Sequence, residues 1–240
     1  RELYKKYCET FPYNFNVFIE FASMEGTLNE INRARKIFEI GITQCNSLLK
    51  MNNIDMIQDI NIKNPEILWK GYIEFEKKLK EYNKVRQLFE RLLEITKHVK
   101  IWISFAEFES SIDNSHKARD IFVRGNDYFK QNLTNNNELN INYQDIIEQR
   151  VLLLNGWLSF EQEWGSPEQI NNVKKLQPKK VKRRKPIKTN EGNDAGYQEY
   201  YDYIFPDNIH FNNSNANNAI NIKLLQKARE WKKKMDKQKQ

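Results

Sequence analysis

A repeated pattern of aromatic residues constrains the fold of this 240-residue chain more than any other feature. Three segments, 18–25, 69–76 and 102–109, each begin with an aromatic residue, carry a second one three residues later and end on a glutamate. An arginine follows each leading aromatic by seventeen residues. Counted from Arg1, the successive arginines lie 34, 51 and 33 residues apart: Arg1, Arg35, Arg86 and Arg119. A period near 33–34 residues indicates a stack of helical repeats.

Each repeat is predicted to be a pair of antiparallel helices. Aromatics at i and i+3 share one face of a helix, and Val85, Leu88, Phe89 and Leu92 form a second apolar stripe. Gly26 and Asn83 are expected to mark turns or caps between paired helices. Because two helices alone cannot cover their apolar faces, neighbouring pairs should stack into an all-α solenoid. The repeat-core residues are Phe18, Phe21, Arg35, Phe38, Trp69, Tyr72, Phe75, Glu76, Arg86, Phe89, Trp102, Phe105, Phe108, Glu109, Arg119, Phe122, Trp157 and Phe160.

The repeats predict a solenoid over residues 1–165 and a partly irregular, basic and aromatic tail over 166–240. Trp157 is expected to lead a fourth aromatic segment, and Arg1 to open the second half of an interrupted repeat, so the chain reads as a piece of a longer protein. Two asparagine-rich stretches are expected to be polar insertions. The predicted repeats are 1–10 (partial), 16–45, 67–96, 100–131 and 143–165, with insertions at 46–64 and 132–142.

The recurring glutamate precedes the recurring arginine by ten residues, as in Glu25 and Arg35. We expect the two side chains to meet inside each helical hairpin, where a bidentate contact would set the register of the helices. The alternative is that both are ordinary surface charges. The remaining two pairs are Glu76 with Arg86 and Glu109 with Arg119.

The scarce residues argue against an enzyme. Cys8 and Cys45 form neither a disulfide framework nor a zinc motif and indicate a reducing compartment. The three histidines, at 98, 116 and 210, are isolated. Glycine-rich phosphate loops and nucleophile motifs are missing, and no apolar run is long enough to span a membrane. We therefore expect no catalytic residue, cofactor, metal or membrane partner.

The positive charge of the chain belongs to its tail. The net charge of +7 is the sum of −3 over residues 1–170 and +10 over 171–240. The tail contains a basic block with nine Lys or Arg and no acid between Lys174 and Lys188. Its core, Lys179, Lys180, Lys182, Arg183, Arg184 and Lys185, fits a nuclear localisation signal, an RNA phosphate contact or a solvated strap. Because no aromatic lies inside the block, base stacking is not expected there.

The tail also contains two candidate docking segments. The first is an aromatic run, predicted to anchor either on the solenoid or on a partner: Tyr197, Tyr200, Tyr201, Tyr203 and Phe205. The second is a helix near 221–238 with an apolar stripe that includes Leu224, Leu225 and Trp231. A basic amphipathic helix suits a groove on a partner, and a membrane surface would favour the same pattern.

The motifs resemble those of a known family. The helix with aromatic spacing followed by Ala-Arg-x-Ile-Phe resembles the half-a-TPR (HAT) repeat of RNA-processing scaffolds over about residues 1–165. Segments 66–76 and 98–106, and then 157–161, 179–185 and 194–206 in that order, are similar to the Crooked neck-like family of pre-mRNA splicing factors. Phe18, where that family usually has Trp, and the asparagine-rich insertions depart from the pattern.

This resemblance implies a non-enzymatic nuclear scaffold of the NineTeen complex that supports assembly and activation of the spliceosome. Its implied partners are spliceosomal proteins of that complex. The alternative is a HAT-repeat RNA-processing factor of another pathway that binds RNA, such as snRNA or pre-mRNA, directly through its basic tail. A homodimer is left open.

Overall fold

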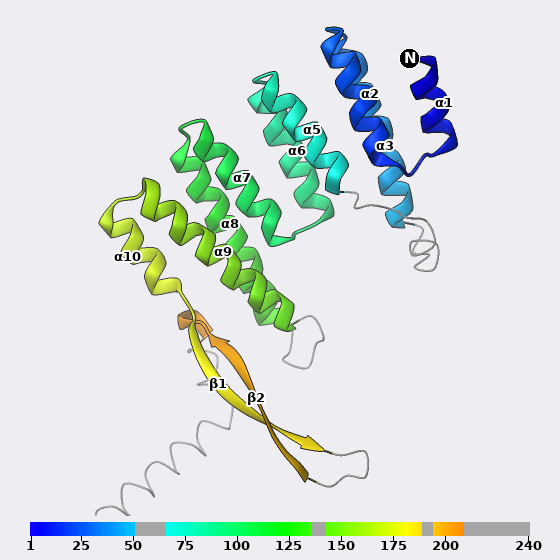
Figure 1. Ribbon diagram of the computed structural model, residues 1–240. Coiled ribbons are helices and arrows are strands. Elements are labelled where there is room, and N and C mark those ends of the chain that lie inside the picture. The colour runs from blue at the N-terminus through cyan, green and yellow to red at the C-terminus, as the bar shows by residue number, and fades with distance from the viewer. Residues whose placement is uncertain (51–65, 136–142, 189–193, 209–240) are drawn as a thin grey trace, which may run out of the picture. The chain divides into compact units, whose positions relative to one another are not determined.

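The computed structural model describes residues 1–50, 66–135, 143–188 and 194–208, and Figure 1 shows its elements along the chain. The chain divides into two compact units, Arg1–Ile101 and Trp102–Gln240. The first unit contains α1 (Glu2–Thr10), α2 (Phe15–Thr27), α3 (Ile31–Lys50), α5 (Glu66–Lys78) and α6 (Tyr82–Ile95). Helix α2 packs on both α3 and α5, and α1 packs on α2.

Helix α7 (Val99–Ser111) begins just before the division and lies mainly in the second unit. It is followed by α8 (Ser115–Asn135), α9 (Tyr143–Trp164), α10 (Pro167–Leu176), β1 (Lys179–Lys188), β2 (Asp194–Ile204) and a short 3-10 helix (Pro206–Asn208). Helix α9 packs between α8 and α10. Among the helices of the described residues, none combines the length and the apolar character needed to cross a bilayer.

Stacked aromatic rings join successive helical pairs. Phe38 on α3 stacks on Tyr72 of α5, with ring centroids 4.6 Å apart and planes at 7°. Phe122 on α8 stacks in the same way on Trp157 of α9, at 5.9 Å and 2°. All four rings are buried, and burying a large apolar side chain contributes about 1.5–3 kcal/mol. The predicted all-α solenoid of helical hairpins is confirmed.

One recurring turn reverses the chain between paired helices. Asn29, Lys80 and Asp113 adopt positive φ angles of 61°, 57° and 60°, each four residues after the repeat glutamate. The backbone N–H of the next residue donates to the carbonyl oxygen of that glutamate, at 2.9, 3.1 and 2.9 Å. This bond closes the carboxyl end of the first helix. The predicted turn positions are therefore wrong: Gly26 lies inside α2 and Asn83 inside α6.

Gly26 meets a packing requirement instead. A Cβ added there would lie 2.6 Å from Cε2 of Phe75 on α5, closer than real side chains approach. Gly71 on α5 faces Ile19 of α2, and a Cβ there would lie 2.9 Å from Cγ1 of Ile19. These two glycines let α2 and α5 approach closely enough to bury the aromatic stripe.

The helices extend further into the two asparagine-rich stretches than the repeat pattern indicated. Helix α3 runs to Lys50, so the predicted insertion at 46–64 begins within a helix. Helix α8 runs to Asn135 and buries Leu133, which lies in the predicted insertion at 132–142. The rest of both insertions, and the predicted helix near 221–238, lie outside the described residues.

The basic block forms a strand, which the sequence analysis missed. Strands β1 and β2 pair as an antiparallel hairpin, visible as the twisted ribbon that follows α10 in Figure 1. Lys180 pairs with Tyr203, Lys182 with Tyr201, and Arg184 with Glu199. The register shifts near Pro186, which has no backbone N–H to donate. A lysine-rich strand has low intrinsic β-propensity, but the tyrosine-rich partner strand provides it with ring and carboxylate contacts.

Candidate interaction site: the arginine–glutamate seam and the basic hairpin

Arg1, Arg35 and Arg119 each pair with the glutamate of the following repeat. Arg35 on α3 donates from Nε and Nη2 to Oε1 and Oε2 of Glu76 on α5, at 2.7 and 2.8 Å. Arg1 makes the same two-pronged contact with Glu25, at 2.8 and 2.9 Å. Glu25 and Glu76 are both buried. We call these pairs, together with the Arg119 pair described next, the arginine–glutamate seam.

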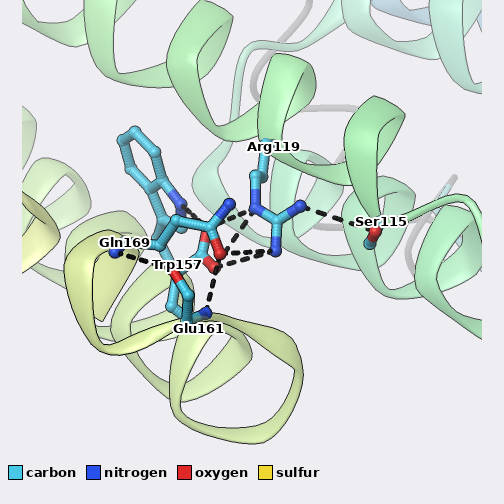
Figure 2. Close-up of polar contacts among 6 residues, drawn as sticks. Ser115, Arg119, Trp157, Glu161 and Gln169 are labelled. Atoms are coloured by element: carbon cyan, nitrogen blue, oxygen red, sulfur yellow. Dashed lines mark hydrogen bonds and ion pairs between the residues drawn. The ribbon is translucent and has the colours of Figure 1, made fainter.

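The third pair of the seam belongs to a larger network, drawn in Figure 2. Arg119 on α8 donates to both carboxylate oxygens of Glu161 on α9, at 2.8 and 3.1 Å. The indole N–H of Trp157 also donates to Glu161, at 3.1 Å. Gln169 accepts from Arg119 at 3.3 Å, and with Ser166 it forms the capping box of α10. The network therefore joins α8 and α9 to the amino end of α10.

The predicted contact inside each hairpin is wrong for Glu25 with Arg35. The carboxylate of Glu25 already faces Arg1, while the guanidinium of Arg35 faces α5. The expected partner of Glu76 was Arg86, and its carboxylate is taken by Arg35. Arg119 likewise turns to Glu161 rather than to Glu109. The glutamate and the arginine are ten residues apart in each repeat. That spacing does not tell on which face of its helix each side chain lies, so it does not predict the contact.

The seam also corrects the register of the fourth aromatic segment. Trp157 was expected to lead that segment, in the place of Trp69. The structure gives Trp157 the place of Tyr72, because it stacks on Phe122 as Tyr72 stacks on Phe38. Phe160 and Glu161 then occupy the places of Phe75 and Glu76, and the leading position falls to Leu154, which is buried.

A second arginine–carboxylate pair on α3 is more exposed than the seam. Glu39 accepts from Nη1 and Nη2 of Arg91 on α6 at 2.8 and 2.9 Å, and both side chains remain more than 40% exposed. The hydrogen bond from Arg91 holds the pKa of Glu39 below its ordinary value. The guanidinium of Arg91 also lies over the ring of Trp69, at 5.4 Å. Burial raises the pKa of the neighbouring Tyr72 to about 12, so its phenol stays protonated.

A buried arginine, which the sequence analysis missed, holds the end of the hairpin. Arg150 on α9 is fully buried and donates from Nε to Oδ1 of Asn126, at 3.0 Å. Its Nη2 donates to Oδ2 of Asp207 at 2.6 Å, and its guanidinium lies 4.2 Å from the ring centroid of Phe205. We call these four residues the hairpin root. The available signal was a single arginine beside the apolar run 151–154.

Opposite charges meet at the hairpin root. Burial raises the pKa of Asp207, but the hydrogen bond and the charge of Arg150 outweigh it, and the net shift is downward. Lys130 adds a second cation 3.5 Å from the same carboxylate. Among the predicted docking aromatics of the described tail, Phe205 is buried against the helices, whereas Tyr197 and Tyr201 are exposed. Leu224, Leu225 and Trp231 lie outside the described residues.

The basic hairpin itself presents its charges to solvent. Arg183 pairs with Asp202 at 2.9 Å, Arg184 with Glu199 at 3.1 Å, and Lys182 also contacts Glu199. Lys179, Lys180, Lys182, Arg183 and Arg184 all have exposed side chains. Ammonium Nζ of Lys180 lies 4.3 Å from the ring centroid of Tyr201. The basic block has no aromatic residue of its own, but strand pairing brings tyrosines from β2 beside it.

Metal binding and thiol chemistry are two further activities to consider for the described residues. No three His, Cys, Asp or Glu side chains gather there in a way that could hold a metal ion. Burial raises the pKa of the Cys45 thiol to about 11, which keeps it protonated and unreactive near neutral pH.

Comparison with known proteins agrees with the class of protein that this fold defines. Residues 61–154 match the family model described as the PRP39 C-terminal HAT repeat. Together with the stacked helical hairpins, this match indicates that the helical pairs are HAT repeats.

Within that class the sequence aligns with Crooked neck-like splicing factors over nearly its whole length. It is 39% identical over 97% of its length to Crooked neck-like protein 1 of Homo sapiens, covering 24% of that protein. It is 37% identical to pre-mRNA-splicing factor CLF1 of Paracoccidioides brasiliensis and 34% identical to Crooked neck-like protein 1 of Dictyostelium discoideum. Each alignment covers 97% of this chain, but only 31% and 32% of those relatives. The predicted resemblance is confirmed, and the chain spans about a quarter to a third of the relatives it matches.

Proposed function

We propose that this chain is part of a non-enzymatic scaffold for pre-mRNA splicing. The observation that carries the proposal is the alignment over 97% of the chain with pre-mRNA-splicing factor CLF1 of Paracoccidioides brasiliensis, and with Crooked neck-like protein 1 of Homo sapiens and of Dictyostelium discoideum. The alignments extend well beyond the repeats into the tail, because the repeats end near residue 165. The proposed location is the nucleus, and the proposed partners are spliceosomal proteins of the NineTeen complex.

The side-chain chemistry supports a scaffold. The seam uses a buried carboxylate and a guanidinium to hold each repeat against the next, which suits an element that must keep a set geometry. Repeat proteins of this kind offer long surfaces on which several partners can bind at once. Among the described residues, Arg35, Glu39 and Asp207 have pKa values shifted by hydrogen bonds and ion pairs within the fold.

Affinity purification of the tagged chain from nuclear extract tests the proposal. We expect splicing proteins to be recovered with the wild-type chain. Arg35→Met, which breaks the seam between α3 and α5, should reduce that recovery, whereas Arg33→Met should not. Arg33 is a matched control because it lies on the same helix, is 55% exposed and pairs only loosely with Glu30. A folded wild-type chain that recovers no splicing protein would contradict the proposal.

A second candidate function is direct RNA binding through the basic tail. The observation that favours it is the exposed lysine and arginine side chains of β1, which are available for phosphate contacts. It is compatible with the scaffold role, since a scaffold can hold both proteins and RNA. A homodimer stays a prediction, which sedimentation of the purified chain would test.

A further inference from the structure

The two faces of the hairpin differ in composition. Because side chains alternate along a strand, β1 and β2 each contribute every second residue to one face. The cross-strand pairs Lys180 with Tyr203, Lys182 with Tyr201, and Arg184 with Glu199 place one set together, and Tyr197 falls on the same side. We call this set the basic–aromatic face: Lys180, Lys182, Arg184, Tyr197, Tyr201 and Tyr203.

Two of the three rings of this face are exposed, and Tyr203 is half-buried. Tyr197 is 71% exposed and Tyr201 is 56% exposed, although large aromatic side chains lose free energy by remaining in water. By register position the opposite face carries Lys179, Arg183, Lys185 and Asp202. Tyr200 is the one tyrosine of β2 whose register position falls on that side. The two faces thus carry similar charge, and the basic–aromatic face alone adds a row of tyrosines.

We propose that the basic–aromatic face binds single-stranded RNA, with bases stacked on Tyr201 and Tyr197 and phosphates held by the adjacent cations. This proposal rests on the RNA-binding candidate above. It adds which face of the hairpin binds and that the RNA is single-stranded. Glu199 neutralises one charge of the face, so three cations leave a net attraction for phosphate. Lys180 already lies over the Tyr201 ring, and the combination of a cation with an exposed ring is how proteins hold unpaired bases without reading their sequence.

The hairpin root supports this assignment. Arg150, Asp207 and Phe205 hold the end of β2 against α8 and α9, so the strand pair starts from a fixed point. The root lies at the carboxyl end of β2, whereas Tyr197 lies near the amino end of the same strand. Tyr197 and Tyr201 are four positions apart on β2, about 13 Å along an extended strand, a distance that stretched single-stranded RNA can span between two unstacked bases.

Fluorescence anisotropy with a labelled 20-nucleotide oligouridine and with an RNA duplex of equal length tests the proposal. The full 240-residue chain is used, so the basic residues beyond the hairpin are present in every variant. We expect the single strand to bind more tightly than the duplex, and the affinity to fall as salt rises. Tyr201→Ala should weaken single-strand binding about 5- to 150-fold, while Tyr201→Phe, which keeps the ring, should stay within about twofold of wild type.

Two double variants provide a matched control for charge. Lys180→Gln with Arg184→Gln removes one lysine and one arginine from the basic–aromatic face, and Lys179→Gln with Arg183→Gln removes the same pair from the opposite face. Each double variant also breaks one arginine–carboxylate ion pair of the hairpin. We expect the first to lower the slope of log affinity against log salt by about 1.4, and the second to lower it less.

Three results would overturn the proposal. The first is the absence of binding to the single strand at low salt, including the case in which the hairpin binds an acidic protein instead. The second is equal loss in the two double variants, which would indicate general attraction without a face. The third is wild-type affinity in Tyr201→Ala. Recovery of splicing proteins from nuclear extract is measured separately, so a failure here leaves the scaffold proposal to its own test.

Discussion

The seam and the hairpin use the same chemistry in different surroundings. In the seam, Arg35 faces a Glu76 carboxylate that is fully buried, and both oxygens accept hydrogen bonds. In the hairpin, Arg184 faces a Glu199 side chain that is 39% exposed, and the Arg184 side chain itself is 72% exposed. Water can replace the contact in the second case but not in the first. The difference teaches that an ion pair acts as a structural element where its partner has no access to solvent.

The largest expected effect comes from breaking the seam. Arg35→Met leaves the buried Glu76 carboxylate without its guanidinium, which should reduce the free energy of unfolding by about 3–5 kcal/mol. Amide hydrogen exchange on α3 and α5, together with urea denaturation, measures the loss. The double variant Arg35→Met with Glu76→Leu should recover most of the stability, since no buried charge remains. A loss below about 1 kcal/mol in the single variant would show that the seam contributes no more to stability than an exposed surface ion pair does.

The hairpin root should show the next largest effect, and it should depend on pH. Asp207→Asn removes a charge-assisted hydrogen bond to buried Arg150, at a cost of about 1.5–3 kcal/mol at pH 7. The folded pKa of Asp207 lies below its ordinary value of 3.8, so the carboxylate stabilises the fold above that value. This contribution is lost as pH falls through the folded pKa. The difference between wild type and variant should therefore shrink as the pH falls below 3.8 and through the lower folded pKa.

An intermediate case lies on the same helix as the seam. Glu39→Gln disrupts a pair in which both partners are more than 40% exposed, so we expect a loss of about 0.2–1 kcal/mol. The loss should shrink in 0.5 M salt, whereas the effect of Arg35→Met should hardly change, because buried pairs are screened much less. Thermal unfolding at low and high salt makes the comparison. A salt-insensitive loss above about 2 kcal/mol would show that exposure does not separate the two pairs.

The smallest expected effect on stability is in the hairpin. Arg183→Gln removes a surface ion pair with Asp202 and should change the free energy of unfolding by less than about 0.5 kcal/mol. Urea denaturation is the measurement, with Arg35→Met as the contrasting variant. If Arg183→Gln instead released the tail, seen as faster amide exchange across β1 and β2, the hairpin charges would be structural rather than free for a ligand.

Part of the fold follows from the chain alone. The aromatic spacing predicted paired helices, and the rings of Phe38 and Tyr72 meet as stacked repeats require. This succeeds because apolar periodicity is a local property that only one face of a helix can satisfy. The same reasoning failed for Trp157, whose local spacing resembles a leading aromatic. Its true place is set by Phe122, a residue 35 positions earlier in the chain.

The partners of the charged residues could not be read in the same way. Glu76 has Arg86 ten residues away along the chain, but its carboxylate binds Arg35 of the preceding repeat. The strand β1 was missed because its lysines match no β pattern until β2 is paired with them. The fully buried Arg150 was missed because its partner, Asp207, lies 57 positions later in the chain, and no local sequence pattern links the two.

The sequence by itself determined that this chain builds helical repeats, where their apolar stripes lie, and that its positive charge belongs to the tail. Only the tertiary structure decided which arginine meets which glutamate, where the fourth repeat is in register, and that the basic block pairs with tyrosines. The physical reason is the separation along the chain of the residues that interact. Backbone periodicity and charge content are set by neighbours in the chain, whereas burial, ion pairing and strand pairing depend on residues that only folding brings together.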